Sequence, residues 1–339
     1  MSDVTGPRTS TAGATEVGAQ LNEAGGKGRG KSSRLLSVGG ALRGVARQRA
    51  RRAGLPAAPA VLIVPALGLV GYFIVLPIAT VVLHAFTNWQ PGMSSPFDGL
   101  ANFRALTTSE EFRSILGNEA FLLLGLPFWV AVPVLISFAL YERVRGANVF
   151  RAVLFFPSMT SPALIGVLFG LLLSPIGPID RILTDLHMGF LAQNWLANSG
   201  LVKPVLLCVT VWWVTGIGVV LFSANLATLP QNLLEQAEID GAGWMRKLWT
   251  VVVPDLLPTL RVWLLLLMII VLGNMFPWIY TLTHGGPGYA STTLDYFIYN
   301  TAINIGQFGP AAAATVVLLA LLGICIGLGM IVMKLAKWR

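Results

Sequence analysis

The sequence predicts an all-α polytopic membrane protein with six transmembrane helices and both termini in the cytoplasm. Of the 339 residues, 55% are hydrophobic and 11% are charged, whereas a soluble domain has about 25% charged residues. Uncharged stretches of about 20 residues, enough for a helix to cross a ~30 Å hydrocarbon core, recur along the chain. The net charge of +8 gathers at one end. These observations exclude a soluble globular protein.

A basic arm comes before the first apolar stretch. Residues 1–57 hold ten Lys or Arg against three acidic residues and contain no aromatic residue. Nucleic-acid-binding segments combine basic residues with aromatic ones, so we expect no nucleic-acid partner. A Gly-, Ala- and Ser-rich arm directly before an apolar segment predicts a largely disordered cytoplasmic tail that faces membrane lipid. The transmembrane domain then comprises residues 58–339.

Six segments can each form a transmembrane helix: about 58–84, 118–141, 152–174, 204–226, 259–282 and 309–333. With the arm inside, 19 of the 23 Lys and Arg residues fall on the inner side, as the positive-inside rule requires. Prolines within or beside the spans predict kinked or broken helices, which either line a transport pathway or bend a packed bundle; they are Pro65, Pro77, Pro127, Pro133, Pro157, Pro162 and Pro277.

The inner loop at 229–258 is the most informative segment. Pro230 favours the start of a helix, and Gly241 and Gly243 favour its end. Glu235 and Glu238, three residues apart, share one side of this helix. The loop therefore predicts two short helices joined by a glycine turn, a shape that fits a groove on a soluble partner. By spacing alone, it equally fits an amphipathic loop on the membrane surface. Small and apolar residues form the opposite stripe: Leu233, Leu234, Ala237 and Gly241.

This loop resembles the signature of ABC importer permeases. That signature is Glu-Ala-Ala, two residues, Asp-Gly-Ala, and an aliphatic pair that closes on proline. It corresponds here to Glu235-Gln236-Ala237, Asp240-Gly241-Ala242, and Val251, Val253 and Pro254. Gln236 departs from the usual alanine. Further stretches are similar to the carbohydrate-type permeases related to the maltose and glycerol-3-phosphate importers: Leu76-Pro77, Phe86-Thr87-Asn88-Trp89, Gly99-Leu100, Asn102-Phe103, Phe150-Arg151, Phe155-Phe156-Pro157, Leu282-Thr283, Gly285-Gly286-Pro287, Phe308-Gly309 and Ala311-Ala312-Ala313.

The resemblance implies a type I ABC importer permease fold in the cell membrane. It implies that this chain pairs with a second permease subunit, two cytosolic ATP-binding subunits and an extracellular or periplasmic solute-binding protein. The chain itself is then not an enzyme and binds no cofactor, because ATP and Mg are held by the ATPase partner. The residues that couple to the ATPase are implied to be Glu235, Gln236, Ala237, Asp240, Gly241 and Ala242.

The resemblance also implies a solute path along the fourth and fifth spans. Aromatic faces there can stack on a sugar, and an amide can bond its hydroxyl groups. The spans carry no cationic cluster at mid-membrane, so we expect a neutral di- or oligosaccharide, or a sugar-like solute, in preference to glycerol-3-phosphate. The candidate path residues are Thr210, Trp213, Ile217, Leu272, Asn274, Met275 and Trp278.

Three alternatives remain open. An ion-coupled secondary transporter needs ionisable residues within the membrane, and the predicted spans carry almost none. A membrane-embedded enzyme needs a catalytic cluster, and none is visible. An ABC permease for amino acids or peptides fits the Gly285-Gly286-Pro287 stretch less well, by resemblance only. We expect no metal site, because Cys208 and Cys325 each stand alone in an apolar run.

Overall fold

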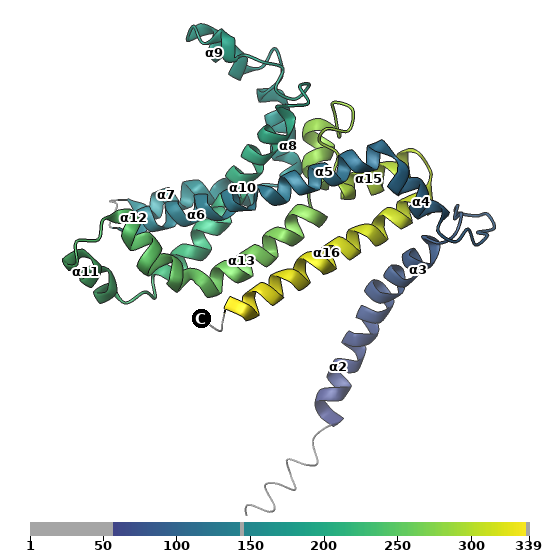
Figure 1. Ribbon diagram of the computed structural model, residues 1–339, viewed down its shortest axis with the longest axis horizontal. Helices are drawn as coiled ribbons and strands as arrows, with labels where there is room; N and C mark the ends of the chain where they lie inside the picture. The colour runs from purple at the N-terminus through teal and green to yellow at the C-terminus, as the bar shows by residue number, and fades with distance from the viewer. Residues whose placement is uncertain (1–56, 143–145, 337–339) are drawn as a thin grey trace, which may run out of the picture. The chain divides into compact units, whose positions relative to one another are not determined.

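The computed structural model describes residues 57–142 and 146–336, so nearly all of the predicted arm lies outside the described residues. The chain divides into two units, one ending at Leu76 and one beginning at Pro77. The described part of the first unit is helical: α2 (Ala57–Val70), a π-turn η1 (Gly71–Val75) and the first residue of α3 (Leu76–His84). None of the residues of η1 is buried. Figure 1 shows these elements in purple and blue.

The second unit is built from helices, apart from an isolated antiparallel bridge between Thr87 and Phe97. The all-α prediction is therefore confirmed for the described residues. Along the chain, its further elements are α4 (Ala101–Thr108), α5 (Glu110–Leu124), α6 (Leu126–Tyr141), α7 (Ala147–Phe155), η2 (Phe156–Met159), α8 (Pro162–Leu172), α9 (Pro178–Asp185), η3 (Gly189–Leu191), α10 (Val202–Leu226), α11 (Gln231–Ile239), α12 (Trp244–Lys247), η4 (Leu248–Val252), α13 (Val253–Gly273), α14 (Phe276–Trp278), η5 (Ile279–Thr283), α15 (Leu294–Tyr299), η6 (Asn300–Asn304) and α16 (Phe308–Ala336).

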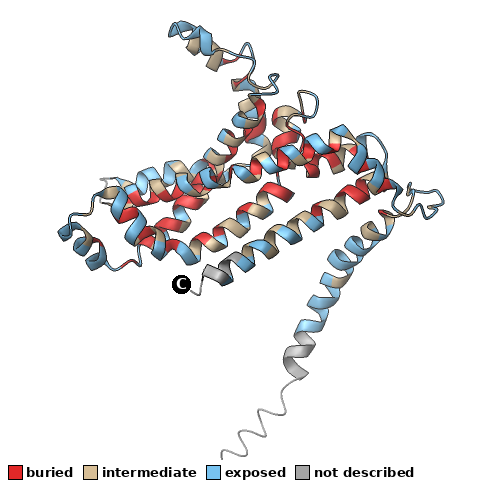
Figure 2. Ribbon diagram, viewed as in Figure 1, coloured by how far each residue is buried: buried red, intermediate tan, exposed pale blue. Residues whose placement is uncertain are grey.

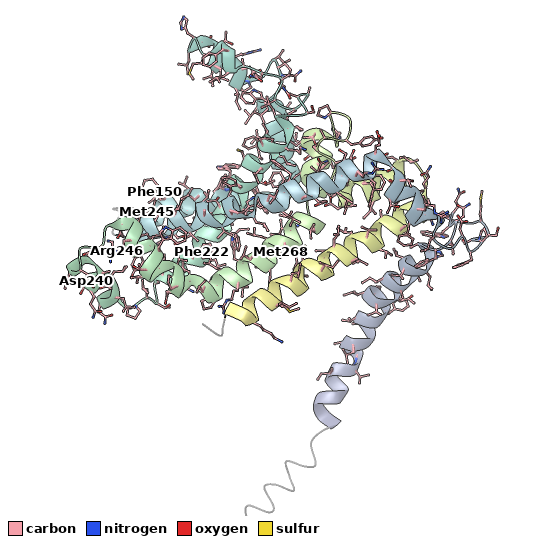
Figure 3. All side chains as sticks on the ribbon, viewed as in Figure 1. Phe150, Phe222, Asp240, Met245, Arg246 and Met268 are labelled. Atoms are coloured by element: carbon pink, nitrogen blue, oxygen red, sulfur yellow. The ribbon has the colours of Figure 1, made fainter. Side chains whose placement is uncertain are left out.

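The core of the second unit lies between α6, α10 and α13. Their buried faces, red in Figure 2, meet through large side chains such as Phe138, Phe222 and Trp263. The indole Nε1–H of Trp263 donates to the carbonyl of Trp129 over 3.2 Å, which joins α13 to α6. A second cluster packs α16 against α4, α5 and α15. Figure 3 places Phe222 and Met268 along this bundle.

Within residues 57–142 and 146–336, five helices are long and apolar enough to cross a membrane, and the number of spans is six if a bent pair counts as one. That pair, Ala147–Met159 and Pro162–Leu172, is bent by 95° at the predicted third span. The predicted span over 152–174 is therefore a broken one, in agreement with the kinks predicted at its prolines. Pro162 explains the bend, because proline restricts the residue before it to extended backbone and starts a new helix. Ser161 accordingly has an extended ψ of 133°.

The predicted fifth span differs from the structure. A continuous helix begins at Trp244 and runs to Gly273, so the second short helix of the inner loop is not separate from the span. The helix then breaks at Asn274, whose φ of −143° is not helical. After the break, the chain continues as α14 and η5. The last part of the predicted fifth span, 259–282, therefore consists of short helical turns and does not continue α13.

Candidate functional site

The loop that carries the Glu-Gln-Ala and Asp-Gly-Ala stretches forms one projecting helix, α11, and a tight turn. Pro230 stands just before it with extended backbone. At its other end, the amide of Ala242 donates to Ala237 over 2.8 Å and that of Gly241 to Glu238 over 2.9 Å. This is the Schellman pattern, which needs a left-handed residue, and Gly241 supplies it with φ +72°. The predicted glycine turn is confirmed at this position.

The signature residues lie mostly on the surface of this projecting helix. Glu235, Gln236, Asp240 and Gly241 are exposed, while Ala237 and Ala242 are half-buried. Leu234 is the single buried residue of α11, and the other predicted stripe residue, Leu233, is exposed. Figure 3 shows Asp240 at the end of the unit that carries α11. A surface of this kind is available to another protein.

Gly241 and Gly243 offer a matched pair of substitutions. A Cβ at either position meets no atom within 4 Å, but only Gly241 has positive φ. We expect Gly241→Ser to weaken the turn by about 1 kcal/mol, since a side chain strains left-handed backbone, and Gly243→Ser to leave it unchanged. Hydrogen–deuterium exchange of α11 measures the difference as a roughly fivefold faster exchange in Gly241→Ser alone. Equal exchange in both variants would contradict the role given to this turn.

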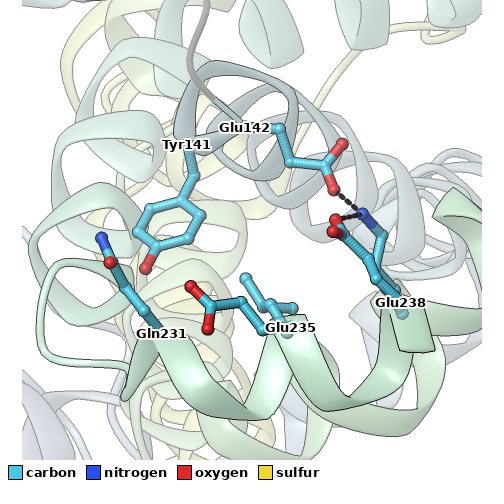
Figure 4. A pocket seen from close by; sticks show the side chains of 7 residues that line it. Tyr141, Glu142, Gln231, Glu235 and Glu238 are labelled. Atoms are coloured by element: carbon cyan, nitrogen blue, oxygen red, sulfur yellow. Dashed lines mark hydrogen bonds and ion pairs between the residues drawn. The ribbon is translucent and has the colours of Figure 1, made fainter. Parts of the chain in front are cut away.

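A cleft of about 510 Å³ separates α11 from the end of α6. Tyr141 and Glu142 line one side, and Gln231, Leu234, Glu235, Glu238 and Lys247 line the other. Figure 4 shows Glu235 pointing into this cleft on the side of Tyr141. Three carboxylates and one ammonium group give the cleft a net negative charge, which favours a basic side chain of a partner.

Lys247 bridges the two sides of this cleft. Its Nζ lies 3.0 Å from Oε1 of Glu238 and also pairs with Glu142. The residue is 7% exposed. The positive-inside rule places Lys247 among the charges on the cytoplasmic side and does not predict its burial. The spacing does indicate burial, because Lys247 lies three residues after Trp244 and four before Val251, on the apolar face of its helix.

The predicted solute path is only partly at the surface. Thr210, Leu272, Met275 and Trp278 are buried within the chain, so these four line no surface in this structure. Asn274 is exposed, and Trp213 and Ile217 are half-buried. The indole N–H of Trp213 donates to the carbonyl of Thr160 over 3.0 Å and thereby holds the bend between η2 and α8. Trp213 also packs edge-on against Trp278, with centroids 5.5 Å apart.

A buried polar network, which sequence reasoning missed, holds the break at Asn274. Asp295 at the start of α15 accepts the amide of Phe276 over 2.5 Å, the hydroxyl of Thr293 over 2.6 Å and the amide of Tyr296 over 2.8 Å. Burial raises the pKa of Asp295, and these hydrogen bonds oppose the rise. Glu119 in α5 accepts the amide of Leu294 over 2.8 Å.

The same α5 turn also holds the loop that precedes α15. The Asn118 amide donates to the carbonyl of Tyr289 over 2.7 Å and to that of Thr292 over 2.9 Å. Glu119 is 3% exposed and falls inside the predicted second span, so it is an ionisable residue that the sequence reasoning passed over. Its contact with Leu294 gives it a structural role. The network therefore joins α5, the loop and the helix break.

Aromatic rings extend from the break toward the loop before α15. Phe276 stacks on Tyr280 at 5.4 Å and meets Tyr299 at 4.8 Å, and Tyr280 lies 5.9 Å from His284. Tyr280 and His284 are exposed. We call Phe276, Tyr280, His284 and Tyr299 the aromatic strip. Rings with neighbouring hydroxyl groups can stack on a sugar and bond to it. Phe276, Tyr280 and His284 are spaced four residues apart, which is a sequence signal for one helical face, whereas Tyr299 joins them only in the folded chain.

Two features of the chain bear on metal and cofactor binding. Within residues 57–142 and 146–336, His, Cys, Asp and Glu form no group of three or more that could hold a metal ion. The arm does contain one phosphate-loop spacing, Gly-Gly-Lys-Gly-Arg-Gly-Lys-Ser at 25–32. A phosphate loop needs an apolar strand directly before it, and residues 11–24 are small and polar. This match lies outside the described residues and is a product of Gly-Lys-rich composition.

Known proteins share this architecture and sequence. Residues 131–332 match the family model described as "Binding-protein-dependent transport system inner membrane component". The multiple sugar-binding transport system permease protein MsmF of Streptococcus mutans is 30% identical over 269 residues, covering 78% of this chain and 90% of MsmF. The arabinooligosaccharides transport system permease protein AraP of Bacillus subtilis is 31% identical over 252 residues, covering 73% and 79%.

A solved structure gives the same result for the fold. One chain in the crystal structure of a bacterial ABC transporter that imports the acidic polysaccharide alginate superposes with a TM-score of 0.70 at 20% identity, covering 84% of this chain and 98% of that one. The resemblance drawn from the sequence motifs is thus confirmed, and this chain belongs to the family of binding-protein-dependent transport system inner membrane components.

Proposed function

We propose that this chain is one permease subunit of an ATP-driven ABC importer in the cell membrane, which takes up a sugar or sugar-like solute delivered by an extracellular binding protein. In this proposal it forms a heterodimer with a second permease, and two cytosolic ATP-binding subunits hold the ATP and Mg. Both termini and α11 face the cytoplasm. The observation that carries the proposal is α11: a projecting helix, fixed by a Schellman turn, that bears exposed Glu235 beside an acidic cleft.

The solute is proposed to be neutral. Asn274, Trp213, Ile217 and the aromatic strip are the exposed or half-buried groups around the break, and none of these is a Lys or Arg. A doubly charged phosphate would find no cation there to compensate for its lost hydration. Ring faces and amide or hydroxyl groups suit a sugar instead. Relatives named for sugars and arabinooligosaccharides support the same choice, whereas other relatives are named for sn-glycerol-3-phosphate.

Affinity purification of the tagged chain in mild detergent tests the proposal. We expect wild type to bring down an ATPase with Walker motifs and a second permease. Glu235→Arg should retain the second permease and lose about 90% of the ATPase, because it reverses the charge that faces the partner. Gln307→Arg places an arginine at an exposed position outside α11 and should retain both proteins. Mass spectrometry identifies and quantifies the partners.

Two results would contradict the proposal. If wild type purifies alone and solute uptake follows an ion gradient, the chain is a secondary transporter, and buried Glu119 becomes the residue to examine. If Glu235→Arg and Gln307→Arg lose equal amounts of ATPase, the coupling surface does not lie on α11.

A further inference from the structure

Lys247 is an unusual residue for its position. Lysine is among the residues least often buried, yet Lys247 is 7% exposed. Removing an ammonium group from water costs several kcal/mol unless partners compensate for it. Here two carboxylates do so: Glu142, the residue that ends α6, and Glu238 in α11. The ammonium group of Lys247 donates hydrogen bonds to both carboxylates, so the three side chains form a charged triad.

The triad joins three elements that are far apart in sequence. Glu142 belongs to the end of α6, Glu238 to α11, and Lys247 to the helix that runs from Trp244 to Gly273. Little else attaches α11 to the bundle: it packs on α12 and η4, and Leu234 is its one buried residue. On the side of α6, the space is the open cleft of about 510 Å³. Figure 4 shows Glu142 and Glu238 at this cleft, with dashed lines that mark the ion pairs linking them.

The two glutamates of α11 therefore differ in their ion pairing. Glu238 is occupied within the chain, whereas Glu235 points into the cleft and has no ion-pair partner among the described residues. Among the described residues, Glu235 is therefore open to another protein, whereas Glu238 is paired with Lys247. A partner that binds Glu235 would displace α11. The contacts of Lys247 would then determine whether the bundle is displaced together with α11.

We propose that Lys247 is a positioning residue that fixes α11 to the bundle, so that displacement of α11 by the ATPase reaches the break at Asn274. This inference rests on the proposed function. The helix that carries Lys247 at one end terminates at Gly273, directly before Asn274. The helix continues from Lys247 through the π-turn η4 into α13, which contains Pro258, and the backbone hydrogen bonds of α13 carry a displacement along its axis. The triad supplies the connection at the α11 end of that helix.

The test measures transmission separately from ATP hydrolysis. The assembly that this chain forms with its ATPase and second permease is purified with Cys208→Ser, Cys325→Ser and Asn274→Cys. It is reconstituted in vesicles loaded with ATP and vanadate, and a membrane-impermeant maleimide is added outside. The labelling rate at position 274 reports the state of the break. With Lys247 present, we expect ATP and vanadate to change this rate about tenfold, as for a two-state shift.

Variants separate the triad from general charge effects. Lys247→Met should retain ATP hydrolysis by the assembly and abolish the change in labelling. Lys247→Arg keeps a cation between the two carboxylates and should retain the change. Arg246→Met removes the neighbouring exposed cation, labelled in Figure 3, and should behave as wild type. A merely structural lysine would alter assembly and hydrolysis together.

Several outcomes would overturn the inference. One such outcome is a wild-type response in Lys247→Met, and another is an equal loss of response in Arg246→Met. If Lys247→Met prevents assembly, Lys247→Arg decides: assembly without the response refutes the role. A wild-type assembly with no response at position 274 refutes it as well, because the displacement then does not reach the break. Failure of the wild-type chain to bind an ATPase is different, since that result removes the proposed function itself.

Discussion

Gly216→Ala is expected to reduce the yield of folded protein at least fivefold. Gly216 lies in α10 where α7 and η2 cross it. A Cβ there would lie 2.9 Å from the Cα of Phe155 and closer still to the carbonyl oxygen of Leu154 and the hydroxyl of Ser158. Backbone atoms cannot rotate aside, so the helices must separate. Overpacking of this kind costs about 3 kcal/mol, a large part of the stability of a typical domain.

Gly323→Ala in α16 provides the control for this prediction. A Cβ at Gly323 meets no atom within 4 Å, and alanine favours a helix over glycine by up to ~1 kcal/mol. The monodisperse fraction in fluorescence-detected size exclusion, before and after heating, measures both variants. If both variants lost the same monodisperse fraction, the loss of folded protein would come from reduced helix flexibility and not from the close approach at Gly216. The reasoning extends to Gly218, where a Cβ would lie 2.6 Å from the Cβ of Pro133.

The inner loop could be predicted from sequence because its information is local. Pro230 fixes its own φ, and Gly241 alone can adopt the left-handed backbone of the turn without strain. The bend at Pro162 and the break before Pro277 also follow a local signal, since seven prolines predicted kinks. The sequence alone does not indicate which of these prolines breaks a helix. Pro133 stays inside α6, because the packing of α6 against α10 holds that helix together.

The solute path could not be predicted in the same way. The resemblance implies that Met275 and Trp278 lie on the path, and both are buried within the chain in this structure. The break itself depends on Asp295, 19 residues from Phe276, and the aromatic strip combines α14 and η5 with α15. Lys247 and its two carboxylates likewise meet only in the folded chain. Contacts between distant segments leave no period or spacing in the sequence.

Asp295→Ala is expected to loosen the break at Asn274 strongly. The carboxylate accepts hydrogen bonds from Phe276, Thr293 and Tyr296, and alanine leaves these donors without it. Hydrogen bonds to a charged group are worth about 1.5–3 kcal/mol, so amide exchange at Phe276 should accelerate about a hundredfold. Asp295→Asn keeps the shape and one acceptor oxygen, and we expect about a tenfold acceleration. Hydrogen–deuterium exchange of the peptide that spans Asn274 to Tyr280 measures both.

The control is Asp185→Ala, which removes an exposed carboxylate from α9 and should leave exchange at the break unchanged. If Asp295→Ala exchanges as slowly as wild type, the loop before α15 holds the break through Asn118 and Glu119 alone. If the amide exchange rate is highest in Asp295→Ala, lower in Asp295→Asn and lowest in wild type, a single carboxylate outside the broken helix sets its conformation. The break then belongs to the same polar network as the loop before α15, because Asp295 and Glu119 both bind the start of α15.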